Sequence, residues 1–172
     1  MNSRTLQRTR SIACVGLLTL CAAVAPHAQA HAHGKHYDLT GTWRTTVTTY
    51  DCSTGVENPS FSGYLTFSSD GTTAEATASP AFQPGQRSAG HGYWESGSRN
   101  TFRMVVEAFV LFTTTAPPPA PQFQRGRQRL DAVLKMTGRD KFESVSSGVK
   151  FFNTAGVQVG GGCARSVGER LW

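Results

Sequence analysis

The segment between Arg87 and Glu95 carries side chains suited to acid–base chemistry. His91, Tyr93 and Glu95 alternate along it, so an extended strand places all three on one face, and Arg87 comes from the preceding loop. If this face lines a dry cavity, an imidazole, a phenol and a carboxyl group converge away from water, which is the setting that general acid–base catalysis needs. This interpretation predicts an enzyme in which His91, Tyr93, Glu95 and Arg87 are catalytic.

The same segment has a second possible orientation. Gly92 and Trp94 occupy the opposite face, and a tryptophan favours the protein interior. In that orientation His91 and Glu95 face water, and Arg87 forms an ion pair with a nearby acid. The sequence favours this structural interpretation and leaves the inward face of the strand open.

A second group able to do chemistry is the histidine-rich stretch 31–38. If a peptidase cuts after Ala30, the free amine together with His33 as third residue can chelate Cu(II) or Ni(II), and His31 offers its own amine and ring. The further ligands of a full site are not evident. We therefore interpret the stretch as a flexible tail and expect no metal and no cofactor. Motifs for a serine nucleophile elbow, a phosphate loop, a dinucleotide site or a zinc site do not occur in the sequence.

Residues 1–30 have the three parts of a secretory signal peptide. Three arginines in the first ten residues form a basic start, an apolar stretch covers about 12–25, and Ala28-Gln29-Ala30 offers small side chains to a signal peptidase. The apolar stretch is too short for a comfortable transmembrane helix. We expect cleavage after Ala30, no membrane anchor in the mature chain, and a secreted or periplasmic protein.

Composition argues against a nucleic-acid partner. Charged residues make up 16% of the 172-residue chain, and its formal net charge is +6. Removal of the leader leaves 14 basic and 11 acidic residues, a net charge of +3, which is too small to indicate nucleic-acid binding. Arg125, Arg127 and Arg129 form a basic row that we interpret as the solvated outer face of a strand.

From residue 39 onward, apolar and polar residues alternate between turn residues, and no helical stripe is present. The pattern predicts eight strands, at 42–50, 63–68, 72–78, 91–96, 101–113, 123–136, 141–152 and 157–166. Most connections are short, and a sheet of this size avoids exposed edges by closing on itself. The predicted fold is all-β: a single eight-stranded antiparallel up-and-down barrel over residues 39–172.

The cysteines support closure of the barrel. Cys14 and Cys21 leave with the leader, and the isolated pair that remains indicates one disulfide in an oxidising compartment. Cys52 lies just beyond the first predicted strand and Cys163 lies within the last. These two strands are neighbours in a closed barrel, so closure predicts a Cys52–Cys163 disulfide.

Gly41-Thr42-Trp43 opens the first predicted strand. A Gly-x-Trp at this place in a short secreted barrel resembles the calycin superfamily, which includes the lipocalins. The resemblance implies that Trp43 plugs one end of the barrel and that an arginine near the last strand packs across its indole, with Arg165 as first candidate and Arg170 as second. A Thr-Asp-Tyr-type lipocalin motif is missing, because Gly138-Arg139-Asp140 stands at the turn between strands six and seven.

A closer likeness is to a group of small bacterial secreted proteins. Besides the Gly-x-Trp start, they share a Pro-Gly-Gln-Arg-Ser loop, a Gly-His-Gly-x-Trp-Glu strand and a Gly-Cys-Ala near the end, here Pro84–Ser88, Gly90–Glu95 and Gly162–Ala164. The likeness covers nearly all of the mature chain. It implies a calycin-like fold and no particular activity.

Three functions remain open at this stage. An eight-stranded barrel is about wide enough either to fill with side chains or to hold one small ligand. The leading hypothesis is carriage of a small apolar molecule in the lumen; the alternatives are a cyclase or isomerase using the residues between Arg87 and Glu95, and a filled barrel that acts through its surface loops. The residues expected to line an open lumen are Tyr64, Phe67, Trp94, Met104, Val106, Phe112, Leu130 and Leu134.

Overall fold

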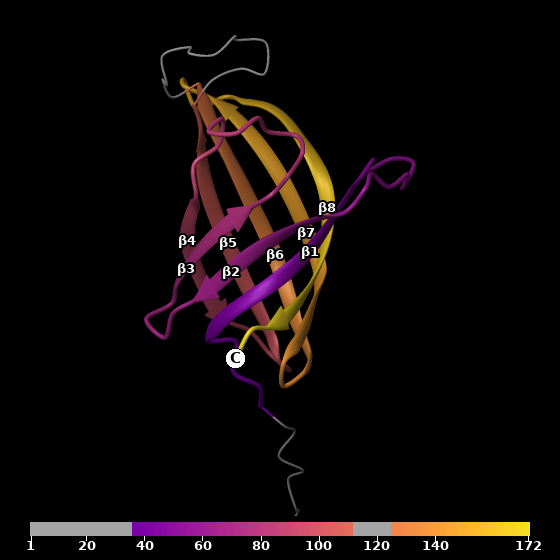
Figure 1. Ribbon diagram of the computed structural model, residues 1–172, viewed down its shortest axis with the longest axis vertical. Helices are drawn as coiled ribbons and strands as arrows, with labels where there is room; N and C mark the ends of the chain where they lie inside the picture. The colour runs from indigo at the N-terminus through magenta and orange to yellow at the C-terminus, as the bar shows by residue number, and fades with distance from the viewer. Residues whose placement is uncertain (1–35, 112–124) are drawn as a thin grey trace, which may run out of the picture. The chain divides into compact units, whose positions relative to one another are not determined.

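The computed structural model describes residues 36–111 and 125–172, and in these ranges the chain forms eight β-strands and no helix (Figure 1). None of the described residues belongs to a helix long and apolar enough to span a membrane. The strands are β1 (Gly41–Tyr50), β2 (Phe61–Phe67), β3 (Thr72–Thr77), β4 (Gly90–Ser96), β5 (Thr101–Val110), β6 (Gly126–Gly138), β7 (Lys141–Asn153) and β8 (Gln158–Arg170).

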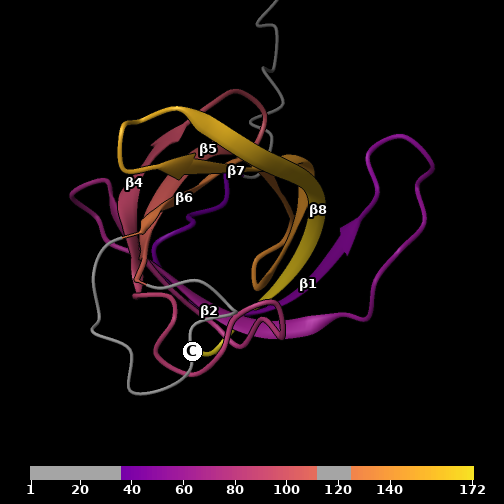
Figure 2. The same cartoon turned by 90° about the horizontal axis from the view of Figure 1, so that it is seen from above.

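The strands close into one antiparallel up-and-down barrel, which confirms the predicted fold (Figure 2). Each strand pairs with the next in the chain, and β1 closes the ring by pairing with β8 from Trp43 opposite Arg170 to Tyr50 opposite Cys163. β8 begins near its predicted start but extends to Arg170, beyond its predicted end at residue 166. This extension brings the end of the chain beside the start of β1.

The predicted disulfide is confirmed. Cys52 and Cys163 are bonded with their Cα atoms 5.3 Å apart, although 111 residues separate them in sequence. The register explains the contact, because Tyr50 lies opposite Cys163 and Cys52 follows two residues later. Such a bond is typical of proteins from oxidising compartments.

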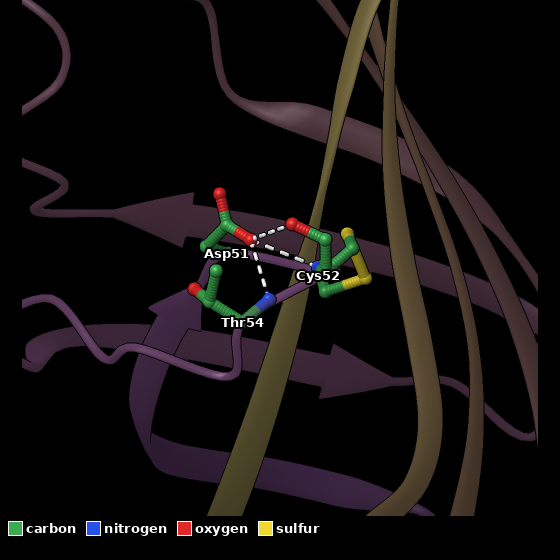
Figure 3. The surroundings of a disulfide bond; sticks show 5 residues. Asp51, Cys52 and Thr54 are labelled. Carbon is green, nitrogen blue, oxygen red and sulfur yellow. Dashed lines mark hydrogen bonds between the residues drawn. A yellow bond between two sulfur atoms is a disulfide. The ribbon is translucent and has the colours of Figure 1, made fainter.

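A tight turn holds Cys52 in place (Figure 3). One carboxylate oxygen of Asp51 accepts hydrogen bonds from the Ser53 hydroxyl at 2.6 Å, the Ser53 amide at 2.8 Å and the Thr54 amide at 2.8 Å. These bonds keep the pKa of Asp51 well below its usual range, with the Ser53 hydroxyl contributing most. The turn is therefore held by the ionised side chain of Asp51, which lies on the solvent-exposed surface of the protein.

Large side chains fill the end of the barrel where β1 begins. Trp43, Phe67 and Phe142 are almost completely buried, and the Trp43 ring lies 5.1 Å from that of Phe142. The Trp43 indole N–H donates to the Leu39 carbonyl at 2.9 Å, so residues before β1 close this end. Gly168 makes room here, since a Cβ at that position would lie 2.2 Å from the Phe142 ring.

An arginine packs across the Trp43 ring, and it is Arg170. Its guanidinium carbon lies 4.2 Å from the ring centroid, and its nitrogens donate to the Thr40 and Asp38 carbonyls. The first candidate, Arg165, was wrong. β8 continues past residue 166, which places Arg170 opposite Trp43, whereas Arg165 lies at the other end and pairs with Glu57 at 2.7 Å.

Candidate functional site

The opposite end of the barrel encloses a cavity of about 610 Å³. Its volume lies within the range of pockets that hold small organic molecules. Apolar side chains on its wall include Phe61, Leu65, Met104, Leu130, Val149 and Phe151. Residues that carry a hydroxyl group also line the wall: Thr45, Thr49, Thr77, Ser147 and Ser166. The wall is thus mainly apolar, with scattered hydrogen-bonding groups.

Small residues on β7 and β8 explain why this end is hollow. Inward positions of β8 carry Gly162, Ala164 and Ser166, and β7 contributes Ser147. A Cβ added at Gly162 would meet no atom within 4 Å, whereas at Gly168 the same addition would collide with Phe142. One end of β8 therefore faces open space inside the barrel, whereas the other end packs against Phe142.

A buried polar network lies on one wall of the cavity. The Arg87 guanidinium contacts the Glu75 carboxylate at 2.7 Å, and its Nε donates to the side-chain oxygen of Gln128. The Arg87 and Glu75 side chains are 4% and 10% exposed. Glu75 and Gln128 line the cavity, so a carboxylate and an amide are presented to whatever occupies it.

The strand register gives this network its room. Gly90 of β4 pairs with Glu75 of β3, and Ala108 of β5 pairs with Gln128 of β6, so each polar residue has a small residue as its cross-strand partner. A Cβ at Gly90 would lie 2.7 Å from a Glu75 carboxylate oxygen. Arg87 itself enters from the segment before β4, which bridges to Val110 of β5.

Burial dominates the electrostatics of Glu75. Removal from water raises the pKa of its carboxyl group, and the adjacent Arg87 opposes that rise. The guanidinium beside it favours the ionised carboxylate, which is a hydrogen-bond acceptor in a mainly apolar wall. The network can therefore accept a hydrogen bond from a bound molecule.

The proposed catalytic set does not come together. Tyr93 is 47% exposed, and His91 and Glu95 are also on the outer face of β4, where Glu95 pairs with Arg103 at 3.7 Å. Gly90, Gly92 and Trp94 face inward instead. A Cβ at Gly92 would lie 1.8 Å from the Val105 carbonyl oxygen, so the inward position admits nothing larger than glycine. The acid–base arrangement is wrong, and of its four residues only Arg87 points inward.

The eight expected lumen residues divide into four groups. Met104 and Leu130 line the cavity. Phe67, Trp94, Val106 and Leu134 also point inward, but they belong to the hydrophobic core instead of the cavity wall. Tyr64 was wrong: it is 52% exposed, because Gly63 and Leu65 take the inward positions of β2. Phe112 lies outside the described residues.

The sequence reasoning missed Glu75 and Gln128. A signal for Glu75 existed in the hairpin that turns at Asp70-Gly71, where the Thr72 amide donates to the Asp70 side chain. Counting outward from that turn places Thr73 opposite Phe67 and Glu75 opposite Leu65. Since Phe67 and Leu65 are inward, Glu75 had to be inward too. Gln128 also had a signal, because it alternates with Arg127 and Arg129 of the predicted outer row and so shares the inward face with Leu130 and Ala132.

Two loops contribute to the mouth of the cavity. Phe82, between β3 and β4, lies 6.4 Å from the Phe151 ring, and Arg87 lies 5.8 Å from the Phe82 centroid. The β1–β2 connection adds Asp51, Thr54 and Val56, next to the disulfide. The Phe82 side chain thus connects the mouth to the polar network below it.

The basic row of Arg125, Arg127 and Arg129 lies on the outer side of the barrel but is only partly solvated, since Arg125 is exposed and the Arg127 Nε is buried. Arg129 contacts Asp131 at 3.0 Å and Glu107 at 3.4 Å, and Arg127 lies 4.7 Å above the Phe152 ring. These arginines are engaged by neighbours on the barrel exterior. The row therefore consists of local ion pairs and a stacking contact.

Among residues 36–111 and 125–172, no group of three or more His, Cys, Asp and Glu side chains is arranged to hold a metal ion. The expected amine and imidazole ligands of His31 and His33 lie outside the described residues. Comparison with protein-family models gave no match to this chain, and comparison with curated proteins gave none either. The barrel is compatible with a calycin-like fold, and that likeness rests on its strand order and on Trp43 with Arg170.

Proposed function

We propose that this protein is a secreted or periplasmic carrier that binds a small, mainly apolar molecule in its barrel. The observation that carries the proposal is the 610 Å³ cavity, which occupies one end of a barrel whose other end is densely packed. Burial of an apolar molecule against Met104, Leu130 and Phe151 removes apolar surface from water, which favours binding.

The compartment forms part of the same proposal. Its support comes from the signal-like leader in the sequence and from the Cys52–Cys163 disulfide, which suits an oxidising environment. A carrier that works outside the cytoplasm also benefits from a covalent bond beside the mouth of its cavity.

Native mass spectrometry of the protein purified from a periplasm is the first test. We expect a species heavier than the unliganded chain by a few hundred daltons, and we expect the extra mass to disappear on denaturation. The same spectrum reports the start of the mature chain, for which we expect His31. A mature chain that retains residues 1–30 would contradict the proposed export.

A fluorescence titration tests the cavity itself. N-phenyl-1-naphthylamine, a neutral dye whose emission rises in apolar surroundings, should bind the protein after removal of any copurified ligand. Leu130→Trp places an indole in the cavity and should weaken dye binding at least tenfold. Lys135→Trp puts the same side chain on the exposed face of the same strand and is the matched control.

The comparison of the two tryptophan variants decides the proposal. Equal dye binding by Leu130→Trp and the wild-type protein, with both folded by circular dichroism, would show that the dye binds outside the barrel. Absence of dye binding by the wild-type protein, together with a bare native mass, would exclude the carrier function.

A further inference from the structure

The network of Glu75, Arg87 and Gln128 is more elaborate than an apolar carrier requires. Burying an ion pair removes two charged groups from water, and apolar residues of similar size often serve stability equally well. Here the pair lies on the wall of the cavity, and Glu75 and Gln128 face the space that a ligand would fill. Its position therefore points to a role in recognising the ligand.

Arg87 is held on three sides by the protein. Its Nη2 contacts Glu75, its Nε donates to Gln128, and its Nη1 donates to the Ser88 carbonyl at 3.2 Å. It does not line the cavity, whereas the Glu75 carboxylate does. The Arg87 guanidinium therefore lies behind the Glu75 carboxylate, and Glu75 is the buried charged residue on the cavity wall, whereas Asp51 is an exposed one at the mouth.

The carboxylate retains capacity to accept hydrogen bonds. An ionised carboxylate has about four acceptor positions. In the part of the chain that the structure describes, Arg87 is the polar side chain in contact with Glu75. Oε2 is the oxygen that contacts Arg87 and it is buried, so the acceptor positions left for a group that enters the cavity are those of Oε1.

The charges of Glu75 and Arg87 restrict which ligand group can donate the hydrogen bond to Glu75. An anionic head group would meet the carboxylate directly and would be repelled. A cationic head group would lose its hydration, while the charge of Glu75 is already balanced by Arg87 at 2.7 Å. A neutral hydroxyl group can donate to the carboxylate without either cost.

We propose that the ligand is a neutral, mainly apolar alcohol or phenol whose hydroxyl group donates a hydrogen bond to Glu75. This inference rests on the proposed carrier function and names the chemical class of its ligand. The apolar body would contact Leu65, which pairs with Glu75 across β2 and β3, and Met104. Gln128 keeps Arg87 in place and offers a second polar contact beside the hydroxyl group.

Competition against the dye with matched aromatic probes tests the proposal. 2-Naphthol and 2-methoxynaphthalene have the same ring system with one oxygen attached at the same carbon. The hydroxyl group of 2-naphthol can donate a hydrogen bond, whereas the ether oxygen of 2-methoxynaphthalene cannot. We expect 2-naphthol to bind the wild-type protein about tenfold more tightly, in line with a hydrogen bond to a charged acceptor. We expect 2-naphthoate and 2-naphthylmethylammonium both to bind more weakly than 2-naphthol.

A double variant assigns the preference to the network. Glu75→Met combined with Arg87→Met removes both charges, so that neither is left unpaired in the wall. We expect this variant to keep binding 2-methoxynaphthalene and to lose the preference for 2-naphthol. Glu95→Gln combined with Arg103→Gln removes an exterior ion pair at 3.7 Å and should leave the preference unchanged.

A measurement on the wild-type protein keeps the test decisive if the double variant does not fold. The side-chain carboxyl carbon of Glu75 should shift in the nuclear magnetic resonance spectrum on addition of 2-naphthol, and shift much less with 2-methoxynaphthalene. Equal affinities of the two probes, or tighter binding of either charged probe, would overturn the hydroxyl proposal. The dye itself would still bind in that case, whereas failure of the carrier function would abolish dye binding as well.

Discussion

The two ends of the barrel are built from the same strands yet hold together in different ways. At the closed end, Trp43, Phe67 and Phe142 fill the interior, and Arg170 covers the Trp43 ring. At the open end, the interior holds the cavity and the ion pair of Glu75 with Arg87, and the Cys52–Cys163 disulfide joins β8 to the loop after β1.

The difference shows how one alternating pattern can give both a core and a binding site. An inward position stabilises the barrel by packing only where the residues across from it are large enough to reach it. Where β8 carries glycine, alanine and serine and β7 carries Ser147, the inward positions leave space, and packing contributes less. The Cys52–Cys163 disulfide therefore lies at the end of the barrel that has the least side-chain packing.

Removal of the disulfide should have the largest effect. In the chain-entropy model, closing a loop of this length restricts the unfolded chain enough to stabilise the fold by about 4–5 kcal/mol. We expect Cys52→Ala combined with Cys163→Ala to lose about that amount in urea unfolding. Reduction of the wild-type protein is the control and should give the same value. A loss below about 1 kcal/mol would show that the open end does not depend on the bond.

Truncation of a ring at each end tests the packing contrast directly. We expect Trp43→Ala to cost about 3–5 kcal/mol in the free energy of unfolding, because a fully buried indole leaves a cavity in a dense core. Phe151→Ala, on the half-buried wall at the open end, should cost about 1–2 kcal/mol. Chemical denaturation of both variants measures the difference. Equal losses would contradict the contrast between a packed end and an open one.

Two arginines of β8 provide a finer comparison. Arg170 is 15% exposed, stacks on Trp43 and donates to three carbonyls, so Arg170→Ala should cost about 1–2 kcal/mol. Arg165 is exposed and pairs with Glu57, so Arg165→Ala should cost less than about 1 kcal/mol. Thermal unfolding of the two variants and the wild-type protein measures these losses. A larger loss of stability in Arg165→Ala than in Arg170→Ala would contradict the assignment of the stabilising contact to Arg170.

Acid should act on the turn that carries Cys52. The pKa of Asp51 is lowered in the folded protein, chiefly by the Ser53 hydroxyl, so the unfolded chain binds a proton at a higher pH than the folded one. The stabilisation is present above pH 4, near the ordinary pKa of an aspartate, and is lost as the pH falls toward the lowered value. We expect the melting temperature of Asp51→Asn to fall less than that of the wild type between pH 5 and pH 2.5. A parallel fall in both proteins would show that Asp51 is not responsible.

Most of the fold could be predicted because it depends on local signals. Alternation located the eight strands, the Asp70-Gly71 turn located a hairpin, and the closure of the sheet explained why Cys52 and Cys163 meet. Trp43 was expected to plug one end of the barrel because of the resemblance to the calycins, and the structure buries it there. The signal peptide remains a prediction from residues 1–30.

The site was predicted less well, because alternation fixes two faces without saying which one is inside. His91, Tyr93 and Glu95 form as regular a row as Gly90, Gly92 and Trp94. The choice was made by the close approach of the Val105 carbonyl, which leaves space for glycine alone. Tyr64 fell on the wrong face for a related reason, since Gly63 took the inward position beside Thr45.

The sequence by itself determined an eight-stranded barrel closed by a disulfide, because strand periodicity, turn residues and cysteine positions are properties of neighbouring residues or of chain order. Only the tertiary structure decided that the barrel is half filled and that Glu75 meets Arg87 and Gln128 within it. Those outcomes depend on which residues face one another across the lumen, and that is set by the registers of all eight strands together.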